Sequence, residues 1–128
     1  MLYTVTGSFG IPVVVAERTE FCFQRHIGLV RPNAETNSAW LYYLFLSPQV
    51  LKQADQGATG TAQRTVSLAV LRNFEVPKIV LAKQRAMVAE LDGISAETER
   101  LAAVYRRKLA ALDALKQSLL HQAFTGAL

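Results

Sequence analysis

The chain of 128 residues has a single cysteine, Cys22, and only two histidines. One cysteine cannot form an intrachain disulfide, so we expect a protein of the reducing cytoplasm rather than a secreted, disulfide-stapled domain. Cys22 lies between Phe21 and Phe23 in a strand-like run, which predicts a packed, inert thiol. Since no histidine, cysteine and carboxylate set shows ligand spacing, we expect no metal centre.

Long apolar runs are missing as well. The longest, Ala39–Leu46, is far shorter than the ~20 residues that cross a bilayer. Met1 is followed by no basic region ahead of an apolar stretch. We therefore expect neither a membrane-spanning helix nor a secretory signal.

The sequence also lacks the motifs of common enzymes. It contains no phosphate-binding loop, no glycine-rich dinucleotide fingerprint and no nucleophile elbow. Glu75 and Lys78 only faintly resemble a nuclease acid–lysine pair, because their spacing is one residue too long and Pro77 breaks the strand. We therefore predict a protein that is not an enzyme and needs no cofactor.

Hydrophobic residues make up 51% of the chain and charged residues 19%, which is enough apolar material for a core. The net charge is +4 and the sequence pI is about 9.5. This balance permits a nucleic-acid partner without requiring one.

Residues 1–80 combine short strand-like runs with short helical ones. Glycines and prolines separate the runs, and Thr6–Gly10 reads as a glycine-rich bend between two strands. The expected strands are Met1–Val5, Ile11–Ala16, Phe21–Gln24 and His26–Val30. The expected helices are Ala39–Leu46 behind the cap Asn37-Ser38, Gln49–Gln56 after Ser47-Pro48, and Leu68–Asn73 behind the cap Ser67.

From about Lys83 the period becomes helical, and one helix is expected to run to Phe124, roughly 60 Å at 1.5 Å per residue. Its apolar residues follow alternating steps of three and four, interrupted by Thr98 and Lys108. We call this set the seam: Leu91, Ile94, Leu101, Tyr105, Leu112, Leu115 and Leu119. A lone helix cannot bury such a seam, so we expect a homodimer through this helix, or a partner helix from a part of the protein absent here.

Two polar segments are candidates for DNA contact. In the loop Gly60–Thr65, Gln63 suits adenine, Arg64 suits guanine, and Thr61 suits a phosphate or a thymine methyl group. Gln24 and Arg25 form a second pair. Composition alone favours simpler interpretations, namely a solvated connecting loop and outward-facing polar residues on a strand.

The order of these features resembles one family along nearly the whole chain. Five segments carry the resemblance: the strand–bend–strand Leu2–Pro12, the strands Phe21–Ile27 ahead of Arg31-Pro32, the helix around Leu41–Leu44 with Ser47-Pro48, the segment from Gly60 through Leu68 to Phe74 and Pro77, and the helix that Gln84-Arg85 opens and Leu115–Leu128 closes. Together they are similar to the specificity subunit of type I restriction–modification systems.

The resemblance implies an α+β fold. Residues 1–80 would be the C-terminal part of a small, mixed, β-rich target recognition domain, and residues 81–128 a long coiled-coil spacer helix. The chain departs from the family pattern in having one domain, without its usual N-terminal portion, and in having Ala82 and Lys83 where acidic residues are usual. We therefore expect a partial or half subunit.

The same resemblance implies a non-catalytic function. The chain would recognise double-stranded DNA and direct methyltransferase subunits, and through them restriction subunits, to a split DNA site. The alternative is a coiled-coil interaction protein, or a truncated remnant, without DNA-binding activity.

Overall fold

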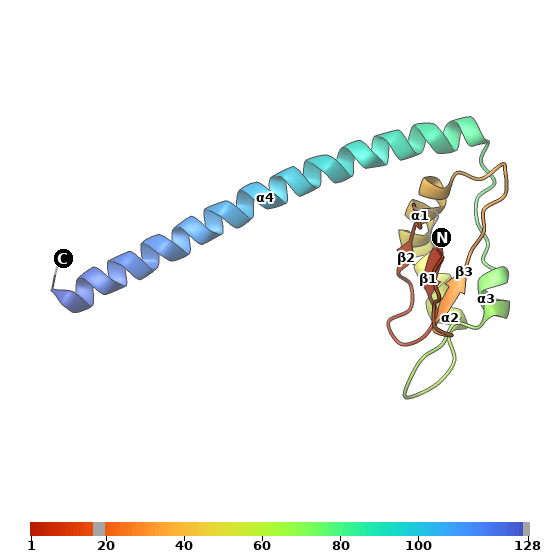
Figure 1. The fold of residues 1–128 in the computed structure, drawn as a ribbon, viewed down its shortest axis with the longest axis horizontal. Coiled ribbons are helices and arrows are strands. Elements are labelled where there is room, and N and C mark those ends of the chain that lie inside the picture. The colour runs from red at the N-terminus through yellow and green to blue at the C-terminus, as the bar shows by residue number, and fades with distance from the viewer. Residues whose placement is uncertain (17–19, 127–128) are drawn as a thin grey trace. The chain divides into compact units, whose positions relative to one another are not determined.

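The computed structural model describes residues 1–16 and 20–126. It divides into two units, Met1–Ala89 and Glu90–Leu128. The first holds a three-stranded sheet and three short helices, and a long C-terminal helix begins in it and continues through the second (Figure 1). The expected α+β class with a long C-terminal helix is confirmed.

The sheet consists of β1 (Leu2–Thr4), β2 (Pro12–Val13) and β3 (Ile27–Leu29) in the order β2-β1-β3, with both pairs antiparallel. In the central strand Tyr3 is fully buried, whereas its neighbours are partly exposed. This alternation is the period-two pattern of a sheet with one covered face.

The predicted strand at Phe21–Gln24 is wrong, since these residues form no strand. The physical reason is that a strand needs a hydrogen-bonded neighbour, and these residues pair with none of the three strands. The prediction that Cys22 is packed is also wrong, because its thiol is exposed and unpaired.

Four helices follow: α1 (Ser38–Leu46), α2 (Pro48–Gly57), α3 (Leu68–Arg72) and α4 (Leu81–Thr125). The predicted caps of α1 and α3 are confirmed, and α2 also begins behind a cap, which the sequence analysis did not predict. The side chain of Asn37 accepts hydrogen bonds from the backbone N–H of Ala39 and Trp40 at 2.9 and 3.0 Å, and Ser47 and Ser67 cap α2 and α3 in the same way. Local chemistry therefore sets where these helices begin.

An aromatic cluster lies at the centre of the first unit. The ring of Tyr3 meets Phe45 edge-on at 5.0 Å between centroids and Phe74 at 6.4 Å. Val50, Ala54 and Val66 are fully buried as well, with relative exposures of 0%, 0% and 1%. The core thus joins β1, α1, α2 and the segments on either side of α3.

The beginning of α4 belongs to the first unit. Gln84, in its first turn, is the one buried polar residue among those described. Its side-chain amide forms hydrogen bonds with backbone atoms of Glu35, Asn37 and Ile79. Beyond it α4 continues through Gly93 without a break. Within the described ranges, no helix is both long and apolar enough to cross a membrane.

Candidate nucleic-acid interface

Three connecting segments meet where β1 ends. The backbone N–H of Val5 donates to His26 at 2.9 Å, and Val66 donates to Val5 at 2.8 Å. The N–H of Gly7 donates to the carbonyl of Arg64 at 3.0 Å. The bend Thr6–Gly10, the turn 24–26 and the loop 58–65 therefore lie together, although they are far apart in the sequence.

The loop 58–65 is closed by two threonines. Thr59 and Thr65 exchange backbone hydrogen bonds of 2.9 and 2.8 Å, and Thr65 also forms a bridge with Thr6. Gly60 has φ +102°, and a Cβ there would lie 2.6 Å from the carbonyl oxygen of Gln63, so the loop requires glycine at this position. Figure 1 shows this yellow-green loop projecting beyond α2.

The predicted contact residues of this loop have different surroundings. Thr61 and Gln63 are exposed, and the Gln63 amide nitrogen lies 3.6 Å from where a Cβ on Gly7 would be. Arg64 is engaged by α2: its Nη1 donates to Asp55 Oδ1 and its Nη2 to the Asp55 carbonyl oxygen, each at 2.5 Å. Its guanidinium also lies 5.5 Å from the centroid of the Phe9 ring.

Gln24 and Arg25, the second predicted pair, lie in the turn that leads into β3, where the N–H of Ile27 donates to the Gln24 carbonyl at 3.1 Å. With Thr65 and Ser67, they line a pocket of about 380 Å³. The structure therefore brings the two predicted segments to the same end of the first unit, with the turn beside the base of the loop.

A larger pocket of about 920 Å³ lies elsewhere in the first unit, between residues 33–36, α1 and residues 76–81. It contains none of the predicted DNA-contact residues, and its ionisable residues are Glu35 and Lys78. In the part of the chain that the structure covers, no three histidine, cysteine or acidic side chains lie close enough to hold a metal ion.

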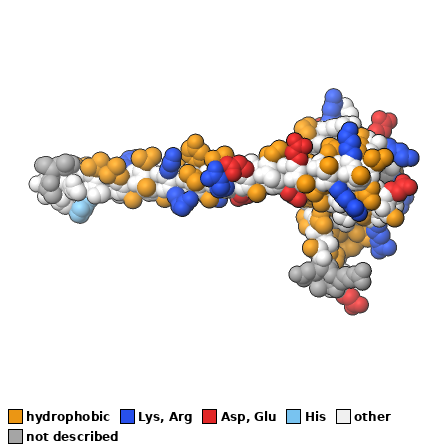
Figure 2. Space-filling view, turned by 90° about the horizontal axis from the view of Figure 1, so that it is seen from above, with side chains coloured by type: hydrophobic (Ala, Val, Ile, Leu, Met, Phe, Trp, Pro, Cys, Tyr) orange, Lys and Arg blue, Asp and Glu red, His pale blue; other side chains and the backbone are white. Residues whose placement is uncertain are grey.

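The seam on α4 is largely uncovered. Leu91 is half-buried, and the other members have side chains that are 44–61% exposed: Ile94, Leu101, Tyr105, Leu112, Leu115 and Leu119. Figure 2 shows hydrophobic side chains recurring along this helix between charged ones. Such a continuous apolar stripe is typical of a surface that another helix covers.

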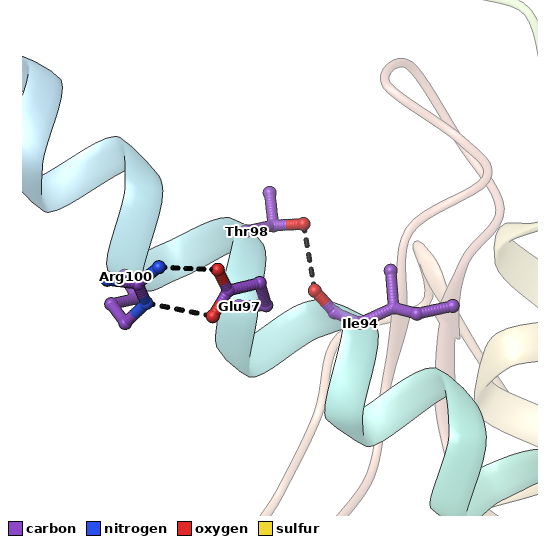
Figure 3. Close-up of polar contacts among 4 residues, drawn as sticks. All are labelled: Ile94, Glu97, Thr98 and Arg100. Carbon is purple, nitrogen blue, oxygen red and sulfur yellow. Dashed lines mark hydrogen bonds and ion pairs between the residues drawn. The ribbon is translucent and has the colours of Figure 1, made fainter.

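The polar break at Thr98 is compatible with such a surface. Its hydroxyl donates to the Ile94 carbonyl at 2.8 Å, within the same helix (Figure 3). Arg100 and Glu97, off the seam, form a two-bond ion pair at 2.8 and 2.6 Å, which lowers the pKa of the Glu97 carboxyl. A partner could therefore cover Thr98 without leaving its hydroxyl unpaired.

The sequence analysis missed several residues of both surfaces. Asp55 and Phe9 carried no signal, because their contacts with Arg64 connect segments that only the tertiary fold brings together. On α4, Leu109, Leu120 and Phe124 are also exposed, the last at 88%. These three do not fall on the seam positions, so the heptad pattern did not select them.

The comparisons with known proteins give one curated relative. Over an alignment of 129 residues, the chain is 25% identical to the type I restriction enzyme EcoBI specificity subunit of Escherichia coli. The alignment covers 100% of this chain and 27% of that subunit, so the chain spans about a quarter of the relative's length. No family model matches the sequence, and no solved structure is significantly similar to it.

Proposed function

We propose that this chain is a DNA-recognition and assembly part of a type I restriction–modification complex. The observation that carries the proposal is its similarity, from end to end, to part of a restriction enzyme's specificity subunit. In this proposal the chain is not catalytic and works in the cytoplasm. It directs methyltransferase subunits, and through them restriction subunits, to one half of a split DNA site.

The DNA-contacting surface in this proposal is the end of the first unit where β1 stops. Its members are Gln24, Arg25, Thr61, Gln63 and Arg64. Their residue types provide both amide and guanidinium groups, which pair with adenine and guanine edges in the major groove. Two features support this choice: the two segments lie side by side, and the loop residues are exposed.

The division of labour follows the two parts of the chain. We propose that residues 1–80 are the reading part and that residues 81–128 are the spacer and assembly helix. The exposed seam supports a homodimer in which two copies of α4 pair. We propose an antiparallel orientation, as in the paired helices of the specificity subunits that the chain resembles. Pairing would bring two reading parts into one particle, as recognition of a split site requires.

Replacing Gln63 by alanine tests the reading surface. The chain is assembled with a methylation subunit and a complementing half subunit, and duplexes are selected from a random-sequence pool. We expect Gln63→Ala to weaken binding to the selected duplex by about 1–3 kcal/mol, the usual value of a bidentate base contact, and to leave binding to a scrambled duplex nearly unchanged.

The matched control is Gln56→Ala, which removes an exposed amide from α2 and should change neither affinity. Equal losses on both duplexes for Gln63→Ala, or no loss, would mean that the loop 58–65 is only a connector.

A second candidate is an interaction protein that assembles through α4 and does not bind DNA. The observation in its favour is that the seam needs a partner helix whether or not the loops contact DNA. Salt dependence separates the two functions. Neutralised phosphates release counterions, so the DNA-binding function predicts an affinity that falls steeply with salt. Dimerisation without any salt-sensitive DNA binding by the assembled complex would leave the second function.

A further inference from the structure

The side chain of Arg64 is already occupied within the protein. Its Nη1 and Nη2 atoms donate to the carboxylate and the carbonyl of Asp55, a residue of α2, and its guanidinium lies over the ring of Phe9. Arginine reads a guanine by donating two parallel hydrogen bonds from its guanidinium, and in Arg64 two guanidinium nitrogens already donate to Asp55. Arg64 would have to leave all of these contacts before it could present those donors to a base.

The backbone of Arg64 is held as well. Its carbonyl accepts the N–H of Gly7, and the next residue, Thr65, exchanges two hydrogen bonds with Thr59. Two segments therefore contact Arg64 itself: α2 through Asp55, and the bend Thr6–Gly10 through its backbone and Phe9. The two arms of the loop join at the next residue, Thr65. We call the contacts of Arg64 with Asp55 and Phe9 the clamp.

We propose that Arg64 is a positioning residue: the clamp fixes the 59–65 loop so that the neighbouring Gln63 is the side chain presented to DNA. This inference rests on the proposed DNA-reading function and assigns roles within it. Gln63 makes no such ion pair and lies exposed beside Gly7. The clamp has a second effect, because Arg64 offsets the negative charge of Asp55, which is 60% exposed beside the loop and would otherwise repel phosphates.

Hydrogen exchange on the full chain, without DNA, tests the clamp itself. The backbone amides of Thr59 and Thr65 report whether the loop is closed, because each donates to the other residue. We expect Asp55→Ala and Arg64→Ala to speed exchange at both amides by about tenfold, since both remove the ion pair that ties the loop to α2, although Asp55→Ala keeps the backbone carbonyl that accepts from Arg64 Nη2. The control is Arg72→Ala, which removes an exposed arginine from α3 and should leave both amides protected. Unchanged exchange in both clamp variants would overturn the proposal.

Binding by the assembled complex tests the role of the clamp, using the duplex selected by the wild-type protein and a scrambled duplex. A positioning role predicts that Asp55→Ala lowers the ratio of the two affinities by about tenfold, as Arg64→Ala does, and that the double variant is no worse than either. If Arg64 read a base directly, Asp55→Ala would leave the ratio unchanged or raise it, because the arginine would be released towards DNA. That outcome would overturn the proposal.

The exchanged pair Asp55→Arg/Arg64→Asp sharpens the test. It rebuilds an ion pair but puts an acid where the arginine stood, so recovery of the affinity ratio above that of the single variants supports positioning. No recovery, with Thr59 and Thr65 protected again, would overturn it. The proposed function fails in a different way, because the wild-type complex would then select no duplex, whatever the exchange experiment shows for the clamp.

Discussion

Replacement of Gln84 by alanine probes how the start of α4 is joined to the sheet-bearing unit. The Gln84 side chain is only 3% exposed and makes three hydrogen bonds. Its Oε1 accepts from the backbone N–H of Asn37 at 2.7 Å, and its Nε2 donates to the carbonyls of Glu35 and Ile79 at 3.0 and 2.7 Å. One amide therefore ties the segment before α1 to the segment before α4.

The expected cost follows from these three partners. A buried polar group that loses its partner costs about 1–3 kcal/mol. Gln84 lines the pocket of about 920 Å³, so water can enter and compensate in part, and the lower end of that range applies. We therefore expect Gln84→Ala to lower the free energy of unfolding by about 3 kcal/mol, roughly 1 kcal/mol for each group left unpaired.

Chemical denaturation followed by tryptophan fluorescence measures this change. Trp40, the single tryptophan, is buried and lines the same pocket. Its backbone N–H donates to the side chain of Asn37, the cap residue that Gln84 contacts. All variants are compared at one protein concentration, because a dimer is stabilised by mass action.

Two further variants serve as controls for Gln84→Ala. Gln117→Ala, on the exposed part of α4, should change stability by less than about 0.5 kcal/mol. Gln84→Glu keeps the size of the side chain and the acceptor for Asn37, but turns a carboxylate towards two carbonyl oxygens, so it should be at least as destabilising as alanine. Stability of Gln84→Ala within about 0.5 kcal/mol of wild type would refute the reasoning.

Three other substitutions, two of them paired with a control variant, test the structure and the proposed dimer. Gly10 has φ +98°, and a Cβ there would lie 2.7 Å from a leucine side chain of α2, so Gly10→Val should cost about 3 kcal/mol in thermal or chemical unfolding. Gly7 has φ +72°, but a Cβ there would meet nothing closer than 3.6 Å, so Gly7→Ala should cost about 1 kcal/mol, and equal costs would contradict this. In the part of the chain described, the buried Tyr3 hydroxyl has no hydrogen-bond partner, so Tyr3→Phe should not destabilise the protein. Burial raises the pKa of Tyr3, so the wild type should lose stability as the pH rises above about 10 through that raised pKa, and a pH titration of unfolding should show this loss reduced in the variant. Leu112→Asp should dissociate the proposed α4 homodimer, as measured by light scattering, while Ala110→Asp, off the seam, should leave it intact. A wild-type protein that is monomeric at micromolar concentration would contradict the proposed dimer.

Local chemistry explains which parts of the fold the sequence predicted. The starts of α1, α2 and α3 follow from Asn37, Ser47 and Ser67, because a capping side chain acts within three residues of itself. The long helix follows from an apolar period sustained over many turns, and it begins and ends within two residues of the expected limits. Neither inference required knowledge of distant contacts.

Strand prediction failed where pairing decides the outcome. Phe21–Gln24 has the aromatic composition of a strand, but a strand forms only where it pairs with a neighbour, and this segment pairs with none of the three strands. The same dependence on distant residues explains why Cys22 is exposed rather than packed. Composition therefore indicated β-structure in this region without showing which segments would pair.

The candidate site shows the same limit at the level of single side chains. Gln63 and Arg64 are adjacent, and from residue type alone both suit base recognition equally well. Their environments differ because α2 places Asp55 against one of them and the glycine bend leaves the other exposed. If the clamp functions as proposed, the residue that determines specificity is the one with fewer contacts inside the protein, and its neighbour contributes by being fully engaged. A sequence can nominate both residues, but only the contacts between distant segments can assign them different roles.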